Sequence, residues 1–184
     1  IEMKSVILTY LAIVLSQIGL YADHHEEGDT KPATRADYIR YTKGMQGMWK
    51  GEVKSVIGDS SLGRAGDTYT AYWSSNRRSS NYAMTSFNGG EKSHNGLTFF
   101  DANLKKIVSI STSNDGTVTR SYLVPKGDSW FRKTIHTKAN GQVSELNSDV
   151  KINVKKGIIT ILIRGKVGSN SLKNQKNIWY RQHK

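Results

Sequence analysis

The amino-acid sequence predicts an all-β fold: an antiparallel, up-and-down β-barrel of roughly eight to ten strands with one short N-terminal helix. From Met48 onward, strand-like segments alternate with turn-forming residues at intervals of roughly 12 to 16 residues. The turn motifs lie at residues 88–90, 101–103, 114–116, 126–128, 140–141 and 155–157. Only two prolines occur in the chain, and the one in the strand region, Pro125, coincides with a turn. A meander that closes on itself leaves no free strand edge, which favours a barrel over an open sheet.

The first 22 residues have the order of a secretory signal peptide. Lys4 supplies a basic start, residues 6–20 are largely apolar, and Ala22 is a small residue suited to cleavage. The apolar run is shorter than the ~20 residues that a membrane-spanning helix needs, and an uncleaved anchor remains the alternative. We expect a secreted or periplasmic protein, cleaved near Ala22 and then not membrane-spanning. Residues 23–33 are expected to form a flexible lead-in and residues 34–184 one barrel domain.

A helix is predicted over residues 34–45, immediately before the first strand. Thr34 and Asp37 have the spacing of a capping box, with Asp in place of the usual Glu. Tyr38, Tyr41 and Met45 then follow at helical spacing. Gly44 or Gly47 is expected to end this helix, which would plug one end of the barrel.

Two hairpins allow the strand register to be predicted. A two-residue loop at Asn140 and Gly141 would pair Ile135 with Leu146 and Phe131 with Val150 on the buried face. The exposed face would then carry Arg132, His136, Glu145 and Asp149. A similar loop at Asp115 and Gly116 would pair Ile110 with Ser121 and Val108 with Leu123 on the inner face.

Two aromatic features suggest how the barrel is closed and filled. Gly47 and Trp49 on the first strand, with Arg181 on the last, are expected to form the structural base, with the guanidinium against the indole. The residues expected to line the interior are Trp49, Val53, Trp73, Met84, Phe99, Ile110, Leu123 and Phe131. These side chains either surround a small apolar or amphiphilic ligand or simply fill the core, and the sequence does not separate the two.

Composition and motifs favour binding over catalysis. The chain has no cysteine, which excludes thiol catalysis and Cys-ligated zinc. His24 and His25 form no rigid metal site, so neither a metal nor a cofactor is expected, and no catalytic residue is assigned. An enzyme built on His94 or His136 would need one of these side chains to be inward, partly buried and paired. The formal charge of +12 supports an alternative role, binding of polyanions such as polysaccharide or lipopolysaccharide. The basic residues are spread along the chain, which argues against a specific nucleic-acid site.

Several short motifs occur in an order that resembles a known family. Residues 43–52 read Lys-Gly-Met-Gln-Gly-Met-Trp-Lys-Gly-Glu, and turn-bearing motifs follow at residues 96–101, 113–117 and 126–130. Together they resemble lipocalin-like proteins of the calycin superfamily, closest to a bacterial secreted family of unknown function. The resemblance implies a barrel whose base includes Trp49 and Arg181, and it implies ligand binding without enzymatic activity. Residues 47–52 are also similar to nitrobindin-like haem barrels. Those barrels need a His near the C-terminal strands, where this chain has only His183, beyond Arg181, so haem is not expected.

Overall fold

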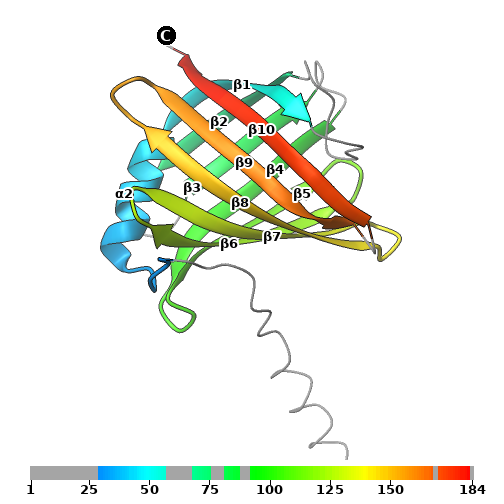
Figure 1. The fold of residues 1–184 in the computed structure, drawn as a ribbon, viewed down its shortest axis with the longest axis horizontal. Coiled ribbons are helices and arrows are strands. Elements are labelled where there is room, and N and C mark those ends of the chain that lie inside the picture. Colours follow the sequence, from blue (N-terminus) through cyan, green and yellow to red (C-terminus); the bar gives the residue numbers. More distant parts are fainter. Residues whose placement is uncertain (1–28, 57–67, 76–80, 88–91, 168–169, 183–184) are drawn as a thin grey trace, which may run out of the picture.

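The computed structural model describes residues 29–56, 68–75, 81–87, 92–167 and 170–182. In this described part of the chain, ten antiparallel strands form one closed barrel, with one helix at one end (Figure 1). The predicted all-β barrel with a short N-terminal helix is therefore confirmed, at the upper end of the expected strand number. The predicted signal peptide lies outside the described residues. The elements are α2 (Arg35–Met45), β1 (Gly47–Val56), β2 (Thr68–Ser75), β3 (Asn81–Phe87), β4 (Lys92–Asp101), β5 (Lys106–Ser113), β6 (Val118–Lys126), β7 (Ser129–Thr137), β8 (Val143–Asn153), β9 (Ile158–Val167) and β10 (Asn170–Gln182).

Each strand pairs with its neighbour in sequence, and β1 closes the barrel by pairing with β10. At this seam Trp49 lies opposite Arg181, and Gly51 lies opposite Trp179. Glycine suits this position because a Cβ on Gly51 would lie 2.5 Å from Cδ2 of the Trp179 indole. The indole therefore packs directly on the backbone of the first strand.

The register of the β7–β8 hairpin differs from the prediction by one residue. Thr134 pairs with Leu146 and Ile135 with Glu145. Lys138 and Gln142 close the loop instead, which leaves three residues in it, and the third, Gly141, has φ 82. A three-residue loop with a left-handed glycine is a standard hairpin connection. Because side chains alternate between the two faces of a strand, the one-residue shift in register exchanges the inward and outward faces of β7.

This slip overturns the predicted faces of β7 and leaves those of β8 intact. Arg132 and His136 point into the barrel rather than to solvent. Leu146 and Val150 are buried, as predicted. Phe131 is buried too, but it lies on the outer face, where the ammonium group of Lys126 is 5.9 Å from its ring centroid.

The β5–β6 hairpin shows the same one-residue difference for the same reason. Ser109 pairs with Ser121 and Ile110 with Arg120. Ser113 and Thr117 close a three-residue loop whose last residue, Gly116, has φ 78. The inner face of β5 consequently carries Ser109 and Ser111 rather than Val108 and Ile110.

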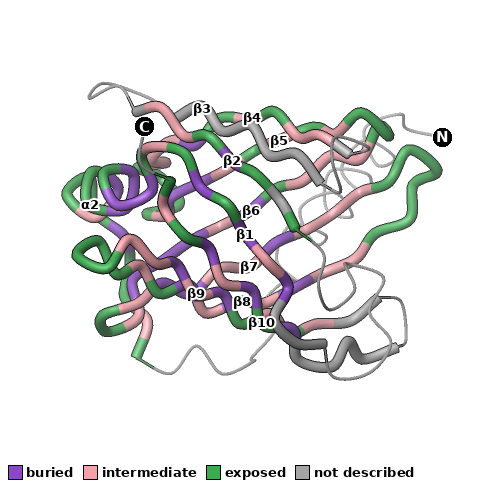
Figure 2. The backbone as a smooth tube through the Cα atoms, turned by 90° about the horizontal axis from the view of Figure 1, so that it is seen from above, coloured by how far each residue is buried: buried purple, intermediate pink, exposed green. Residues whose placement is uncertain are grey.

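The helix α2 plugs one end of the barrel and carries its buried positions on the side that faces the strands (Figure 2). The predicted capping box is present, because Thr34 Oγ1 accepts from the Asp37 backbone while the Asp37 carboxylate accepts from the Thr34 backbone. Tyr38, Tyr41 and Met45 are buried in the core. The Tyr41 ring meets the Trp130 ring edge-on, with 5.2 Å between the centroids.

The segment just before α2 is attached to the barrel. Thr30 forms a β-bridge with Lys126, and the Lys31 N–H donates to the Pro125 carbonyl at 3.2 Å. The Ala33 N–H donates to the Lys105 carbonyl at 2.7 Å, and Ala33 is buried. We call residues 30–33 the N-terminal strap. It connects the start of α2 to the residue before β5 and to the last two residues of β6.

Trp49 and Arg181 tie the other end of α2 to the seam. The Arg181 guanidinium carbon lies 4.7 Å from the Trp49 ring centroid, as the sequence predicts. The same guanidinium donates to the Gly44 carbonyl at 2.9 Å, and the Trp49 indole N–H donates to the Met45 carbonyl at 2.7 Å. One stacked pair therefore joins the first strand, the last strand and the end of the helix. Gly47, with φ 115, turns the chain from α2 into β1.

Candidate functional site

A cavity of about 270 Å³ lies inside the barrel, next to the core under α2. Its walls differ sharply in chemistry. Around the barrel, β8, β9, β2 and α2 supply mostly apolar side chains, and β4 to β7 supply mostly hydroxyl groups. Strand β10 supplies Trp179 and the hydrogen-bonded amides Gln175 and Asn177. The apolar wall consists of Tyr41, Met45, Trp73, Leu146, Val150, Ile159, Ile161, Ile163 and Trp179. Within it, the Trp73 and Trp179 rings meet edge-on with 5.9 Å between centroids.

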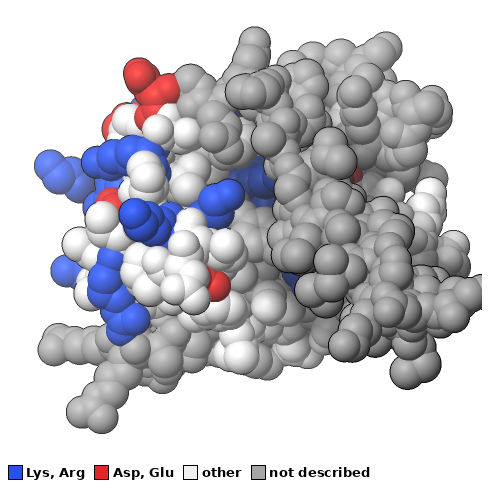
Figure 3. Space-filling model, turned by 90° about the horizontal axis from the view of Figure 1, so that it is seen from below, with Lys and Arg blue, Asp and Glu red and all other residues white. Residues whose placement is uncertain are grey.

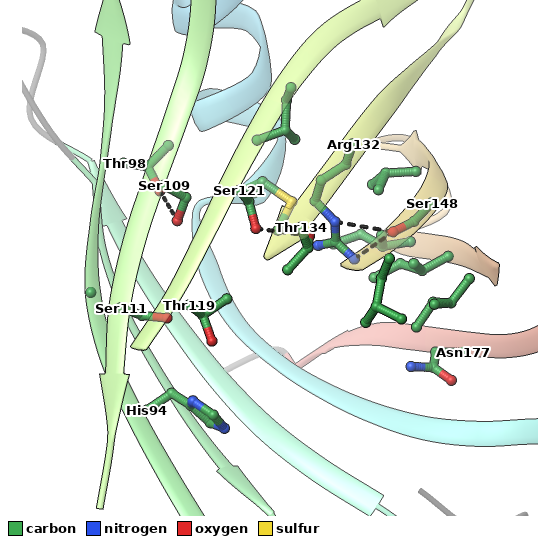
Figure 4. A pocket seen from close by; sticks show the side chains of 18 of the residues that line it. His94, Thr98, Ser109, Ser111, Thr119, Ser121, Arg132, Thr134, Ser148 and Asn177 are labelled. Atoms are coloured by element: carbon green, nitrogen blue, oxygen red, sulfur yellow. Dashed lines mark hydrogen bonds between the residues drawn. The ribbon is translucent and has the colours of Figure 1, made fainter. Parts of the chain in front are cut away.

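The opposite wall carries a ladder of hydroxyl groups across four adjacent strands (Figure 4). Thr98, Ser109, Ser121 and Thr134 are successive register partners on β4, β5, β6 and β7. Thr98 Oγ1 donates to Ser109 Oγ at 3.1 Å, and Ser121 Oγ lies 2.9 Å from Thr134 Oγ1. The next row toward the far end adds Ser111 and Thr119. A hydroxyl can donate and accept, so this wall offers many alternative hydrogen bonds to a guest.

Arg132 brings a positive charge into the cavity from β7, one inward position before Thr134 (Figure 4). Its Nε and Nη2 both donate to Ser148 Oγ, at 3.3 and 3.2 Å. Burial lowers the pKa of the guanidinium, and interaction with Tyr41 partly opposes this. An arginine keeps its charge even so. Among the described residues, none of the side chains lining the cavity is acidic.

Two histidines lie beyond the hydroxyl ladder, at the end of the cavity away from α2. Thr119 Oγ1 lies 2.9 Å from Nδ1 of His136. Burial, together with electrostatic interaction with Arg132 and His94, lowers the pKa of His136 to about 4. His136 is therefore neutral at pH 7. The predicted exposed pair of His136 and Glu145 is not formed, because Glu145 faces outward and bonds to Lys133 Nζ at 3.0 Å.

The predicted lining residues divide into three groups. Trp73 and Leu123 line the cavity. Trp49 and Val53 lie inside the barrel but in the packed core, where they are fully buried and do not border the cavity. The side chain of Met84 lies outside the described residues.

Three predicted lining residues are wrong, because their side chains lie on the outer face of the barrel. Ile110 is 38% exposed, and its register partner is the exposed Arg120. Phe99 follows the inward-facing Thr98 and pairs with Val108 on the outer face. Phe131 precedes the inward-facing Arg132 on β7. Selecting large apolar residues was misleading because several inward positions on these strands are small and polar.

Sequence reasoning missed the hydroxyl ladder, Arg132 and His136 as cavity residues. A signal for them existed in the two loops. Asn-Asp-Gly and Ala-Asn-Gly each end in glycine, which suits a three-residue loop as well as a two-residue one. Comparing both registers would have placed Arg132 inside in one of them.

Known proteins give no further guide to this site. Comparison of the chain with models of known families and with curated proteins finds no match. Among the described residues, no three His, Asp or Glu side chains are grouped so as to hold a metal ion. None of the described helical segments has the length and apolar character needed to cross a membrane.

Proposed function

We propose that this protein is a secreted, non-enzymatic binder of a small amphiphilic molecule held in the barrel cavity. The observation that carries the proposal is the division of the cavity into an apolar wall and a hydroxyl-lined wall. A purely structural barrel would fill such a space with interdigitated side chains, as protein interiors normally do. The volume of about 270 Å³ lies near the lower end of sites for small molecules, which favours a small guest. The architecture is also compatible with the lipocalin-like resemblance of the sequence.

Intrinsic fluorescence provides a direct test, because Trp73 and Trp179 border the cavity. Titration with a neutral amphiphile such as 1-octanol should change the emission saturably. Replacing Ile163 with Trp should fill the cavity and weaken this binding, measured by calorimetry. The neighbouring Leu162 is 39% exposed and points outward, so Leu162→Trp is the matched control and should bind normally. Equal binding by both variants would contradict the proposal.

A second candidate function, binding of a polyanion, is favoured by the charge around α2. Lys and Arg side chains gather at the α2 end of one face, with acidic groups interspersed (Figure 3). The strap, α2 and two nearby loops carry exposed cations at Lys31, Arg35, Arg40, Lys43, Lys105, Lys155 and Lys156. Binding to immobilised dextran sulfate that falls steeply between low and physiological salt would support this role. Binding insensitive to salt, or none at low salt, would remove it.

A further inference from the structure

We propose that Arg132 binds an anionic oxygen group, a carboxylate or a sulfate or phosphate ester, on the guest of this cavity. This inference rests on the proposed binding function and specifies its ligand class: an anionic amphiphile whose charged end lies deep in the barrel, toward α2. Three observations support it, namely the missing counter-charge, the unused donors of the guanidinium, and the layout of the walls around it.

The first observation concerns charge. Arg132 lies inside the barrel, and among the described residues its side-chain hydrogen bonds are with one neutral hydroxyl, Ser148. The acidic side chains of the same hairpin face outward, where Asp149 bonds to Lys126 at 3.1 Å and also to Arg164. Arg132 is half-buried, and a charge partly removed from water without an ionic partner is unfavourable. An anionic guest would supply the missing partner.

The second observation concerns hydrogen-bond donors. A guanidinium has five N–H groups, and the contacts with Ser148 use only Nε and one N–H of Nη2. Both N–H groups of Nη1 and the second of Nη2 have no partner among the described residues. Nη1 and Nη2 together form a fork of donors that can give two parallel hydrogen bonds to a carboxylate or phosphate group. Ser148 holds the other edge of the guanidinium and so fixes the orientation of this fork.

The third observation is the arrangement of the walls. Ile161 and Ile163 on β9 line the same cavity as Arg132, and Thr134, the member of the hydroxyl ladder on β7, is the next inward position after Arg132. An anion bound at Arg132 would therefore leave its carbon chain between β9 and the ladder. His136, four residues farther along β7, is neutral at pH 7 and therefore adds no second positive charge beside Arg132.

The test compares three probes with the same eight-carbon chain: octanoate, octyl sulfate and 1-octanol. Calorimetry should show octanoate or octyl sulfate binding to the wild-type protein at least about tenfold more tightly than octanol, since charged hydrogen bonds are the stronger ones. The preferred anion identifies the headgroup as carboxylate or sulfate. Arg132→Met should remove this advantage, so that the variant binds octanoate and octyl sulfate no more tightly than octanol. Arg120→Met, on the exposed face, is the matched control and should keep it.

A second measurement separates ligand binding from a structural role. Removing an uncompensated interior charge should leave the melting temperature of the ligand-free Arg132→Met protein unchanged or raised. Arg132→Lys keeps the charge without the fork, so it should fold and bind octanoate several-fold more weakly. Unchanged octanoate affinity in both folded variants, or equal binding of octanol and both anions by wild type, would overturn the role of Arg132 alone. Failure of all three probes to bind wild type would overturn the proposed function as well.

Discussion

At the scale of single residues, two side chains of similar chemistry play opposite parts. Arg181 has two partners: the Trp49 ring, whose centroid lies 4.7 Å from the guanidinium carbon, and the Gly44 carbonyl, which accepts a hydrogen bond at 2.9 Å. Arg132 has one neutral partner and faces open space. Arg181 therefore contributes to stability, whereas Arg132 is the residue that we propose binds the guest. The sequence identified the first arginine from its place on the last strand. It misplaced the second, because the face of β7 depended on one residue of loop length.

Replacing Arg181 with Ala should lower the free energy of unfolding by about 2 kcal/mol. The variant loses the cation–π contact, the hydrogen bond to Gly44 and the packing of the side-chain stem. Chemical denaturation measures the change, and Arg120→Ala on the exposed face serves as the control. A loss no larger than that of the control would show that the contact does not stabilise the fold.

His136 should make the protein less stable in mild acid. Its pKa is about 4 in the folded state, lowered by burial and by Arg132 and His94, against about 6.5 when unfolded. The unfolded state therefore binds the proton more readily, and stability falls as pH drops through this window, by about 2 kcal/mol between pH 7 and pH 5. His136→Gln should flatten this part of the denaturation profile. A slope that persists unchanged in the variant would assign the effect to other groups.

At the scale of elements, the two hairpin loops decide which side chains face the cavity. Strand positions, the helix and its capping box were predictable from local pattern, because each rests on a few adjacent residues. Strand facing was not, since Asn140-Gly141 is compatible with loops of two or three residues. One residue of difference moved Arg132 and His136 from solvent to the interior. The sequence therefore did not predict that Arg132 and His136 line the cavity, because it left the length of the β7–β8 loop open.

Gly141→Ala should destabilise the β7–β8 hairpin by about 1 kcal/mol, because alanine resists the left-handed conformation. Nothing lies within 4 Å of the added methyl group, so the cost is conformational. Gly141→Asn should lose less, since asparagine tolerates this conformation. Gly116→Ala should lose more, because its Cβ would lie 3.2 Å from the Ala139 Cβ in addition to the strain. Thermal unfolding of the three variants would reveal any other ranking, which would contradict this account of the loops.

At the scale of the whole molecule, closure depends on one long-range pairing. Every other ladder joins strands that follow each other in sequence, whereas β1 and β10 come from opposite ends of the barrel domain. Trp179 packs against Gly51 across this seam, and Arg181 stacks on Trp49 beside it. Closure was predictable from the motifs at residues 47–49 and 179–181. Trp49 near the start of the domain and Arg181 near its end are suited to a cation–π contact with each other.

Gly51→Ala should weaken the seam specifically. The new methyl group would meet the Trp179 ring at 2.5 Å, and overpacking of this kind costs about 1–3 kcal/mol. Hydrogen exchange should accelerate in β1 and β10 more than in β7 and β8. Met48→Ala, at a 45% exposed position on the same strand, is the control. Uniform acceleration in all strands would mean that the barrel opens as a single unit rather than at the seam.

The attachment of α2 at both ends has a consequence for how a guest would come and go. The strap holds the start of the helix through Lys31 and Ala33, and Arg181 and Trp49 hold its end at Gly44 and Met45. If the proposed binding takes place, a helix fastened in this way would hinder passage at the α2 end, and a guest would enter and leave from the end where His94 and His136 lie. A guest would then arrive with its charged group leading and depart with it trailing. The dissociation rate would then depend on breaking the contact between the headgroup and Arg132. Guests with different headgroups would therefore differ mainly in dissociation rate rather than in association rate.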